Sequence, residues 1–358
     1  MKKLILIVAI LSSSFCAGQV SGLSLTENIS EARKLAKEHL ENANIPGMAI
    51  SVSKDGDIIW SEGYGYMNTE IKKKVSPSET QFRIASISKS LTAAGLAKLM
   101  DEEKLNLDES LYIYLPNYPK KKYDFTIRQI GGHLAGIRHY NGSEFVLNKK
   151  MSITEGLDIF KDDALLHEPG SRYRYSTYGW NLLSEVIQVV AKTPFNEFMQ
   201  KSIFAPLEMN NTTLDLSDAL MPNRTQFYIK TNGNKIVLGP EVSNEHKVAG
   251  GGFISTSEDL VRFGNEIISP NILSKESVAE LLKPQSTSDG KSTDYGVGFG
   301  IAKTSKGTPK YSHTGGGIGA TTVLLMYPQE KVVIAVVMNL SQASGRSLVE
   351  KLEEIFID

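Results

Sequence analysis

Ser86 and Lys89 are the two residues of this chain whose types and spacing most directly suggest catalysis. They open a segment with apolar residues at helical intervals, and residues three apart in a helix share a face. A serine hydroxyl becomes an effective nucleophile when a base accepts its proton, and a lysine amine can be that base if its pKa falls from about 10.4. The pair therefore predicts nucleophilic catalysis. The plainer interpretation is a helix cap at Ser86 with a solvated Lys89.

The pattern Ser-x-x-Lys occurs twice more, at Ser51 with Lys54 and at Ser288 with Lys291. Ser51 lies in a predicted strand, where residues three apart point to opposite faces. Ser288 lies in a segment rich in Ser, Gly and Asp, which predicts a loop. Of the three pairs, only Ser86 with Lys89 has the helical setting that this chemistry requires.

Four later segments form an ordered set with the run RIASISKSLT that contains Ser86. They read GHLAGIRH at 132–139, YRYSTYGW at 173–180, AGGGFIST at 249–256 and SHTGG at 312–316. In this order and spacing the chain resembles the superfamily of class C beta-lactamases, penicillin-binding proteins and related esterases. The resemblance runs from about residue 40 to the C-terminus and is greatest for the LACTB-type branch of serine beta-lactamase-like proteins.

The resemblance implies a role for each matching residue. Ser86 would be the acylated nucleophile, and Lys89 its base or proton relay. Tyr175 would share the proton and later activate water or protonate the leaving group. The backbone N–H groups of Ser86 and Gly316 would form the oxyanion hole. The residues that would contact the substrate are Thr177, His313, Thr314 and Gly315.

Two residues depart from the family pattern. Thr177 stands where Asn is usual and has no amide to offer a substrate, and His313 stands where Lys is usual and carries at most a fractional charge near neutral pH. Both changes favour a peptidase- or esterase-like serine hydrolase of small peptides, amides or esters, with weak beta-lactamase activity at most. The open alternatives are a true class C-type beta-lactamase, a slow-turnover penicillin-binding sensor, and a filament-forming structural protein with vestigial activity. Assembly of the chain into a homo-oligomer or a filament is therefore also left open.

The elements that must position these residues are strands at both ends of the chain around a helical middle. An amphipathic helix is predicted over 26–43 and a hairpin over 48–64, with its turn at Asp55-Gly56. The three glycines at 250–252 predict a tight turn before a helix over 255–268, with close approach to the cleft as the alternative. Helices dominate 86–203, and a last helix is predicted over 345–356. The later strands are predicted over 296–303, 309–312, 321–327 and 332–339.

This order of elements predicts the fold class. Short connections between the late strands favour an antiparallel sheet. We expect an α/β (α+β) fold of the serine beta-lactamase / D-Ala-D-Ala peptidase type, in which helices flank that sheet. The domain over 19–358 would have a discontinuous α/β part, about 25–85 and 245–358, and a mainly helical insertion over about 86–244.

Composition and missing motifs exclude several other functions. The 358 residues carry a formal net charge of -1, from 39 Lys and Arg against 40 Asp and Glu, which argues against a nucleic-acid partner. The nucleophile motif Gly-x-Ser-x-Gly and the zinc motif His-Glu-x-x-His are both absent from the sequence. The histidines outside the motifs lack metal-ligand spacing, so we expect no metal and no cofactor.

Residues 1–18 predict a Sec-type signal peptide. Lys2 and Lys3 precede an apolar run over 4–11 that is too short to span a bilayer, and no later stretch is apolar enough to do so. The chain would be exported to the periplasm or secreted, with soluble export favoured over lipid anchoring at Cys16. Cys16 is the only cysteine, so the exported chain would have no disulfide and no thiolate metal site.

Overall fold

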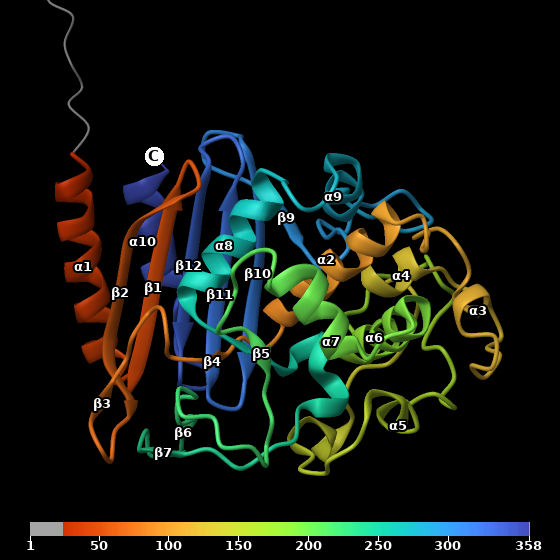
Figure 1. The fold of residues 1–358 in the computed structure, drawn as a ribbon, viewed down its shortest axis with the longest axis horizontal. Helices are drawn as coiled ribbons and strands as arrows, with labels where there is room; N and C mark the ends of the chain where they lie inside the picture. The colour runs from red at the N-terminus through yellow and green to blue at the C-terminus, as the bar shows by residue number, and fades with distance from the viewer. Residues whose placement is uncertain (1–23, 358) are drawn as a thin grey trace, which may run out of the picture.

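A seven-stranded antiparallel sheet forms the centre of the computed structural model, which describes residues 24–357 (Figure 1). Its strands are β1 (Gly47–Lys54), β2 (Asp57–Asn68), β3 (Lys73–Lys74), β9 (Gly300–Lys303), β10 (Pro309–Gly317), β11 (Ala320–Tyr327) and β12 (Val332–Met338). Their order across the sheet is β3-β2-β1-β12-β11-β10-β9. Every residue of β12 is buried, as its run of valines and isoleucine requires of a strand covered on both faces. Because β1 pairs with β12, the two ends of the chain build one sheet.

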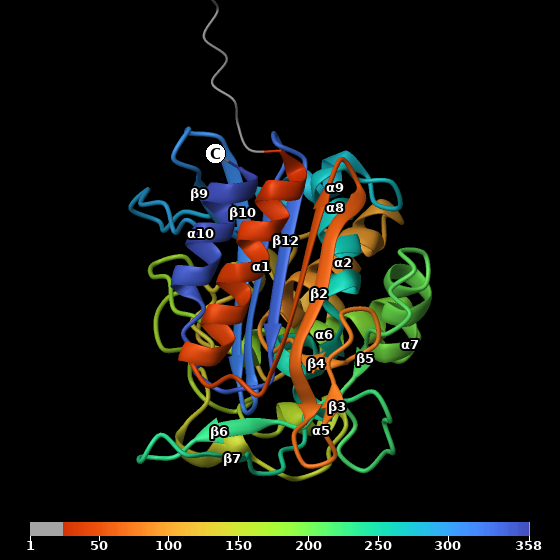
Figure 2. The same ribbon diagram turned by 90° about the vertical axis from the view of Figure 1, so that its left-hand side faces the viewer.

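Two helices from opposite ends of the chain cover one face of this sheet (Figure 2). They are α1 (Leu25–Asn42) and α10 (Arg346–Phe356). Ser24 caps α1 in a capping box, in which its hydroxyl accepts from the Glu27 N–H while the Glu27 carboxylate accepts from the Ser24 N–H at 2.7 Å. Ala32 and Ala36 are fully buried in the apolar cluster on this side.

The opposite face carries α8 (Ser257–Ile268), which contacts β1, β11 and β12. The sequence predicted that this helix starts at Ser255 with a tight turn before it, and both details are wrong. Ser255 ends a short strand, β8 (Phe253–Ser255), and the cap is Thr256, whose hydroxyl accepts from the Asp259 N–H at 3.1 Å. The strand intervenes because β8 pairs with two other short strands, β4 (Phe82–Arg83) and β5 (Thr213–Leu214).

A helical region lies beyond α8 and holds the second apolar cluster. Its helices are α2 (Ile87–Asp101), α3 (Leu111–Tyr114), α4 (Ile127–Gly131), α5 (Ile153–Leu157), α6 (Thr177–Ala191), α7 (Phe195–Met199) and α9 (Lys275–Leu282), and a small hairpin pairs β6 (Tyr228–Lys230) with β7 (Ile236–Leu238). These layers confirm the predicted mixed fold with helices on an antiparallel sheet. We keep the division into 25–85 with 245–358 and 86–244 as a proposal, with α9 as a late segment that returns to pack on α2.

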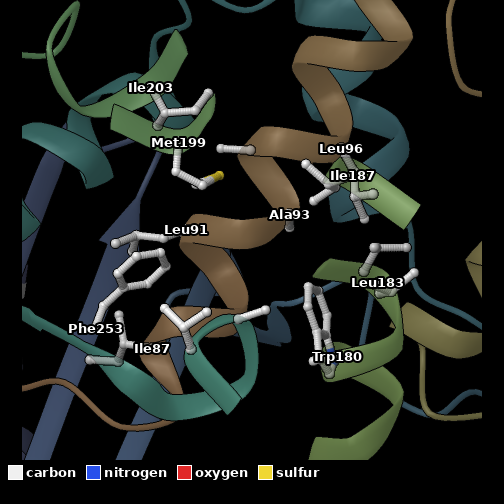
Figure 3. Packing of buried hydrophobic residues seen from close by; sticks show 14 of the residues in the cluster. Ile87, Leu91, Ala93, Leu96, Trp180, Leu183, Ile187, Met199, Ile203 and Phe253 are labelled. Carbon is white, nitrogen blue, oxygen red and sulfur yellow. The ribbon is translucent and has the colours of Figure 1, made fainter. Parts of the chain in front are cut away.

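Helix α2 is buried on nearly every side rather than along one stripe (Figure 3). Trp180, Leu183 and Ile187 of α6 lie along one side of it, and Met199 and Phe253 lie along another. This burial includes the polar side chains of its first turn, so the packing of α2 decides the environment of Lys89. Among residues 24–357, none of the helices combines the length and apolar character that crossing a bilayer requires.

Candidate active site

Ser86 stands at the junction between β4 and the first turn of α2. The residue before it, Ala85, has a φ of 46°, a conformation that residues with a Cβ adopt rarely. Ser86 has helical dihedral angles, and its hydroxyl makes no capping hydrogen bond to the helix. Within residues 24–357 its backbone N–H also has no acceptor. The hydroxyl and the N–H are therefore both available to a bound molecule.

Lys89 lies one helical turn further on and is fully buried. Its Nζ is 3.0 Å from Ser86 Oγ, and it also donates to the carbonyl oxygen of Gly250. In the described part of the chain it forms no ion pair with a carboxylate. Burial without a counter-charge holds the pKa of Lys89 well below its ordinary value. The helical spacing thus brings an amine with a lowered pKa to the serine hydroxyl.

The glycine triplet lies close to this pair and not in a simple turn. Residues 248–252 pack against α2 and α6 as a kinked segment, in which Gly251 has non-helical dihedral angles (φ 179°, ψ 11°). A Cβ on Gly250 would lie 2.4 Å from Thr177 Cγ2, and one on Gly252 would lie 2.5 Å from the Asn244 carbonyl oxygen. The glycines are therefore needed for close backbone approach, which brings the Gly250 carbonyl to Lys89.

Tyr175 lies directly before α6, with its ring centroid 4.9 Å from Lys89 Nζ. Burial raises the pKa of its hydroxyl, while a side-chain hydrogen bond with Ser86 acts in the opposite direction. Tyr175, far from Ser86 and Lys89 in the sequence, thus lies beside both of them.

A cavity of about 220 Å³ opens over these groups. Of the predicted site residues, Ser86, Tyr175, Thr177 and Gly316 line it, and a Cβ on Gly316 would meet no atom within 4 Å. The wall residues that the sequence prediction missed include Arg83, His139, Asn244 and Lys247. Arg83 and His139 lie inside quoted motifs, and Lys247 lies two residues before the motif at 249–256.

The charged side chains in the wall of this cavity are cationic. Arg83 is buried, with its Nε 2.6 Å from Asp215 Oδ2, and Lys247 Nζ donates to the Phe145 carbonyl oxygen at 3.0 Å. Burial lowers the pKa of Lys247 to about 8, so it is still mostly protonated at neutral pH. No Asp or Glu is among the described residues that line the cavity.

The predicted His313-Thr314-Gly315 segment lies in β10, but these side chains are not in the cavity wall. His313 is buried and its Nε2 is 2.9 Å from the hydroxyl of Tyr295. Burial, with the nearby Lys89, lowers the pKa of His313 to about 3, so this ring is neutral at neutral pH. Thr314 is exposed. Gly315 permits close packing, because a Cβ there would lie 2.3 Å from the Ile84 carbonyl oxygen.

The competing Ser-x-x-Lys pairs have no comparable geometry. Ser51 is buried in the sheet with its Oγ 2.8 Å from that of Ser257, while Lys54 is exposed. Ser288 is exposed in a loop. In residues 24–357 no group of three or more His, Cys, Asp or Glu side chains is arranged to hold a metal ion.

Comparison with known proteins identifies the family. The family model for beta-lactamases matches residues 32–353. The human mitochondrial serine beta-lactamase-like protein LACTB is 30% identical over 397 residues, which covers 84% of this chain and 72% of that protein.

Two solved structures share the fold. The octameric penicillin-binding protein homologue from Pyrococcus abyssi matches with a TM-score of 0.78 at 24% identity, over 92% of this chain and 79% of that one. The D-amino acid amidase from Ochrobactrum anthropi SV3 matches with a TM-score of 0.78 at 20% identity, over 91% and 98% of the two chains.

The predicted export of the chain is wrong. The LACTB relatives from human, mouse and cattle are mitochondrial proteins, which contradicts a Sec-type signal peptide over 1–18. The predicted periplasmic or secreted location and the predicted lipid anchor at Cys16 are therefore wrong as well. Residues 1–18 and Cys16 lie outside the described residues. A basic and apolar leader is an address read by transport machinery, so its composition is a weak guide to the compartment.

The family match covers most of the length of the chain, and the LACTB relatives match over more than four-fifths of it. The chain therefore belongs to the beta-lactamase family, in its LACTB-like branch, and the members of this family are generally serine hydrolases.

Proposed function

We propose that the chain is a serine hydrolase that forms an acyl-enzyme on Ser86 and acts on peptides, amides or esters. The observation that carries this proposal is the 3.0 Å separation between Lys89 Nζ and Ser86 Oγ, with Lys89 fully buried and lacking a carboxylate partner among the described residues. An amine kept neutral by burial can accept the hydroxyl proton, as a serine nucleophile requires.

In the first half-reaction Ser86 Oγ attacks the carbonyl carbon of the substrate, and its proton passes to Lys89 Nζ. The negative charge that develops on the carbonyl oxygen is stabilised by the N–H groups of Ser86 and Gly316. Tyr175, beside both Ser86 and Lys89, relays the proton to the leaving amine or alcohol as the bond to the carbonyl carbon breaks. The product of this step is an ester between the acyl group and Ser86.

In the second half-reaction water attacks the ester carbonyl carbon and its proton passes to the Lys89 and Tyr175 pair. The bond to Ser86 Oγ then breaks, the proton returns to this oxygen, and the carboxylic acid leaves. Hydrolysis therefore consumes one water and restores the starting site.

Two residues argue for weak hydrolysis of beta-lactams. His313, in place of the usual Lys, is neutral and faces Tyr295, so it offers no cation to a drug carboxylate. Thr177, in the cavity wall, has no side-chain amide to hydrogen-bond a substrate amide. The D-amino acid amidase from Ochrobactrum anthropi, a protein of the same fold, supports an amide substrate.

Lys247 supports a preference for acyl groups that carry a carboxylate over matched neutral ones, whereas Arg83 is already paired with Asp215. A charge-assisted hydrogen bond contributes about 1.5–3 kcal/mol. This preference should fall as pH rises through about 8, where Lys247 loses its proton. Paired peptide amides with Asp or Asn test it, and an Asp-to-Asn ratio of kcat/KM unchanged by Lys247→Met would contradict it.

Steady-state hydrolysis of a panel of p-nitrophenyl esters, amino acid amides and nitrocefin tests the proposal. We expect turnover of an ester or amide, little of nitrocefin, and a loss of roughly a thousandfold or more in Ser86→Ala. Ser288→Ala is the matched control, because it removes an exposed serine with the same Lys spacing, and it should behave as wild type. Equal activity in Ser86→Ala would reject the proposal.

The same panel separates the alternative functions. A burst of one product equivalent followed by slow turnover would identify a penicillin-binding sensor, and rapid nitrocefin turnover a true class C-type beta-lactamase. A folded protein without turnover or labelling would leave the filament-forming structural role. The octameric homologue from Pyrococcus abyssi supports adding a homo-oligomer to the proposal, which light scattering of the purified chain tests directly.

A further inference from the structure

Two buried or half-buried histidines beside Tyr175 have no part in the proposed reaction. His133 and His139 come from the loop that follows α4, and both rings lie against the ring of Tyr175. The ring centroid of His133 is 4.2 Å from that of Tyr175, and that of His139 is 5.9 Å away in an edge-on contact. Two imidazoles thus enclose the proposed relay tyrosine.

Each of these histidines also accepts a hydrogen bond from the backbone directly after Tyr175. The Ser176 N–H donates to His133 Nδ1 at 3.1 Å, and the Thr177 N–H donates to His139 Nδ1 at 3.1 Å. These two N–H groups belong to the start of α6, where backbone donors have no partner inside the helix. The histidines therefore accept from the two backbone N–H groups that directly follow Tyr175, and so fix the position of Tyr175 at the start of α6.

Further bonds join the same two segments. The Arg174 N–H donates to the His133 carbonyl oxygen at 2.9 Å, and Ser176 Oγ donates to the Arg138 carbonyl oxygen at 2.7 Å. His133 has a φ of 62°, a strained value for a residue with a Cβ, which the surrounding bonds must hold in place. The loop over 133–139 is thus tied to 174–177 on both sides of Tyr175.

An imidazole nitrogen accepts a hydrogen bond only when it carries no proton. Both rings must therefore be neutral, with the proton on Nε2. Burial lowers the pKa of His139 to about 4 and holds the pKa of His133 well below its ordinary value. His133 Nε2 is buried without a partner among the described residues, so Nδ1 is the ring atom that anchors this side chain.

We propose that His133 and His139 are positioning residues that hold the Tyr175 hydroxyl against Ser86 and Lys89 by accepting the backbone N–H groups of Ser176 and Thr177. They act through Tyr175 and do not touch the reacting atoms. This inference rests on the proposed function, because it assigns Tyr175 the proton relay. It assigns the histidines no acid, base or metal-binding part.

Variants of His139, the less buried of the two, test the proposal. His139→Leu removes the acceptor, whereas His139→Asn keeps a carbonyl oxygen at the same branch of the side chain. We expect His139→Leu to lower kcat for an ester substrate by roughly 10- to 100-fold, because small displacements of a catalytic group are costly. His139→Asn should stay within about threefold of wild type. Equal losses in the two variants would overturn the proposal.

A double-mutant cycle with Tyr175→Phe distinguishes positioning from general damage. If His139 acts through the Tyr175 hydroxyl, His139→Leu should lower kcat for the ester substrate by less than about threefold when Tyr175 is already Phe. Independent, multiplying losses would overturn the proposal. Reaction of Ser86 with a fluorophosphonate in the wild-type protein is the separate check on the proposed function. If Ser86 of the wild-type protein reacts with the probe but the losses in kcat multiply in the cycle, the positioning role is rejected and the proposed function stands.

Nitrogen NMR of the imidazole rings reads the protonation of His133 and His139 directly in the wild-type protein. The chain has six histidines, few enough to assign with single-residue replacements. At pH 7 we expect His133 and His139 to be neutral, with the proton on Nε2 and an accepting Nδ1. A proton on Nδ1, or a charged ring, at either position would overturn the proposal.

Discussion

At the scale of single residues, the account depends on a lysine whose pKa is lowered by burial. Lys89 is fully buried, donates to the Gly250 carbonyl and has no carboxylate partner in the described chain. An ammonium ion is costly to bury without such a partner. The burial that lets Lys89 act as a base therefore also lowers the free energy of unfolding.

Replacing Lys89 with Met should stabilise the protein while removing its activity. The unfolded chain binds a proton on Lys89 at any pH below about 10.4, whereas the folded chain resists it, so protonation favours unfolding over that range. We expect the free energy of unfolding of Lys89→Met at pH 7 to exceed that of wild type by roughly 1 kcal/mol or more. Denaturant titration from pH 7 to 10 checks this, and a difference that does not shrink with rising pH would contradict it.

Ser86 and Lys89 should also act as a unit in catalysis. Each single replacement, Ser86→Ala or Lys89→Ala, is expected to lower kcat by about a thousandfold or more, and the double variant should lose little beyond that. The reason is that the proton transfer needs both partners. Steady-state kinetics of the three variants measure this, and losses that multiply in the double variant would argue against a shared proton.

Residue types and spacing pointed to Ser86 and Lys89, whereas Tyr175 was predicted from the family resemblance. His139, Lys247 and the Gly250 carbonyl were missed. Their parts depend on which atoms face the cavity, and a carbonyl group carries no signal in a sequence at all. The missed residues nevertheless lie in or beside the quoted motifs.

At the scale of elements, the turn over 248–252 decides whether Lys89 keeps its second partner. The sequence suggested a tight turn before a helix, because a glycine triplet does not reveal what packs beside it. In the structure Gly250 faces α6 so closely that a methyl group would meet Thr177. The predicted elements of the helical middle were otherwise found, since their periodicity and caps are local signals.

Gly250→Ala should therefore displace this turn from Lys89. We expect a loss of roughly 1–3 kcal/mol in the free energy of unfolding, which is typical of overpacking, and a fall of about tenfold or more in kcat. Gly233→Ala is the matched control, because a Cβ at Gly233 would meet no atom within 4 Å. Thermal unfolding and ester hydrolysis compare the two, and equal behaviour of both variants would contradict the packing argument.

At the scale of the whole molecule, one sheet is built from the two ends of the chain, and the site lies where it meets the helical region. The sequence predicted this arrangement because strand runs such as β12 are short and continuously apolar. It did not predict the order of the strands, which is set by pairings distant in sequence, such as Met48 with Met338. The export predicted from residues 1–18 was wrong, and these residues lie outside the described part of the chain.

The central position of β12 predicts the pattern of hydrogen exchange. β12 lies between β1 and β11 and is buried along its length, whereas β9 is at the edge of the sheet. We expect amides of β12 to exchange at least about tenfold more slowly than those of β9, because central strands open only with global unfolding. Mass spectrometry of peptic peptides measures this, and similar rates in both strands would contradict the described sheet.

The central claim is tested most directly by the site at which a fluorophosphonate probe reacts with the purified chain. The account predicts a single covalent adduct, which peptide mapping assigns to Ser86, and its formation at pH 7 should slow by about a hundredfold or more in Lys89→Ala, which removes the base. A folded wild-type protein that stays unlabelled, or an adduct on another serine, would contradict the account.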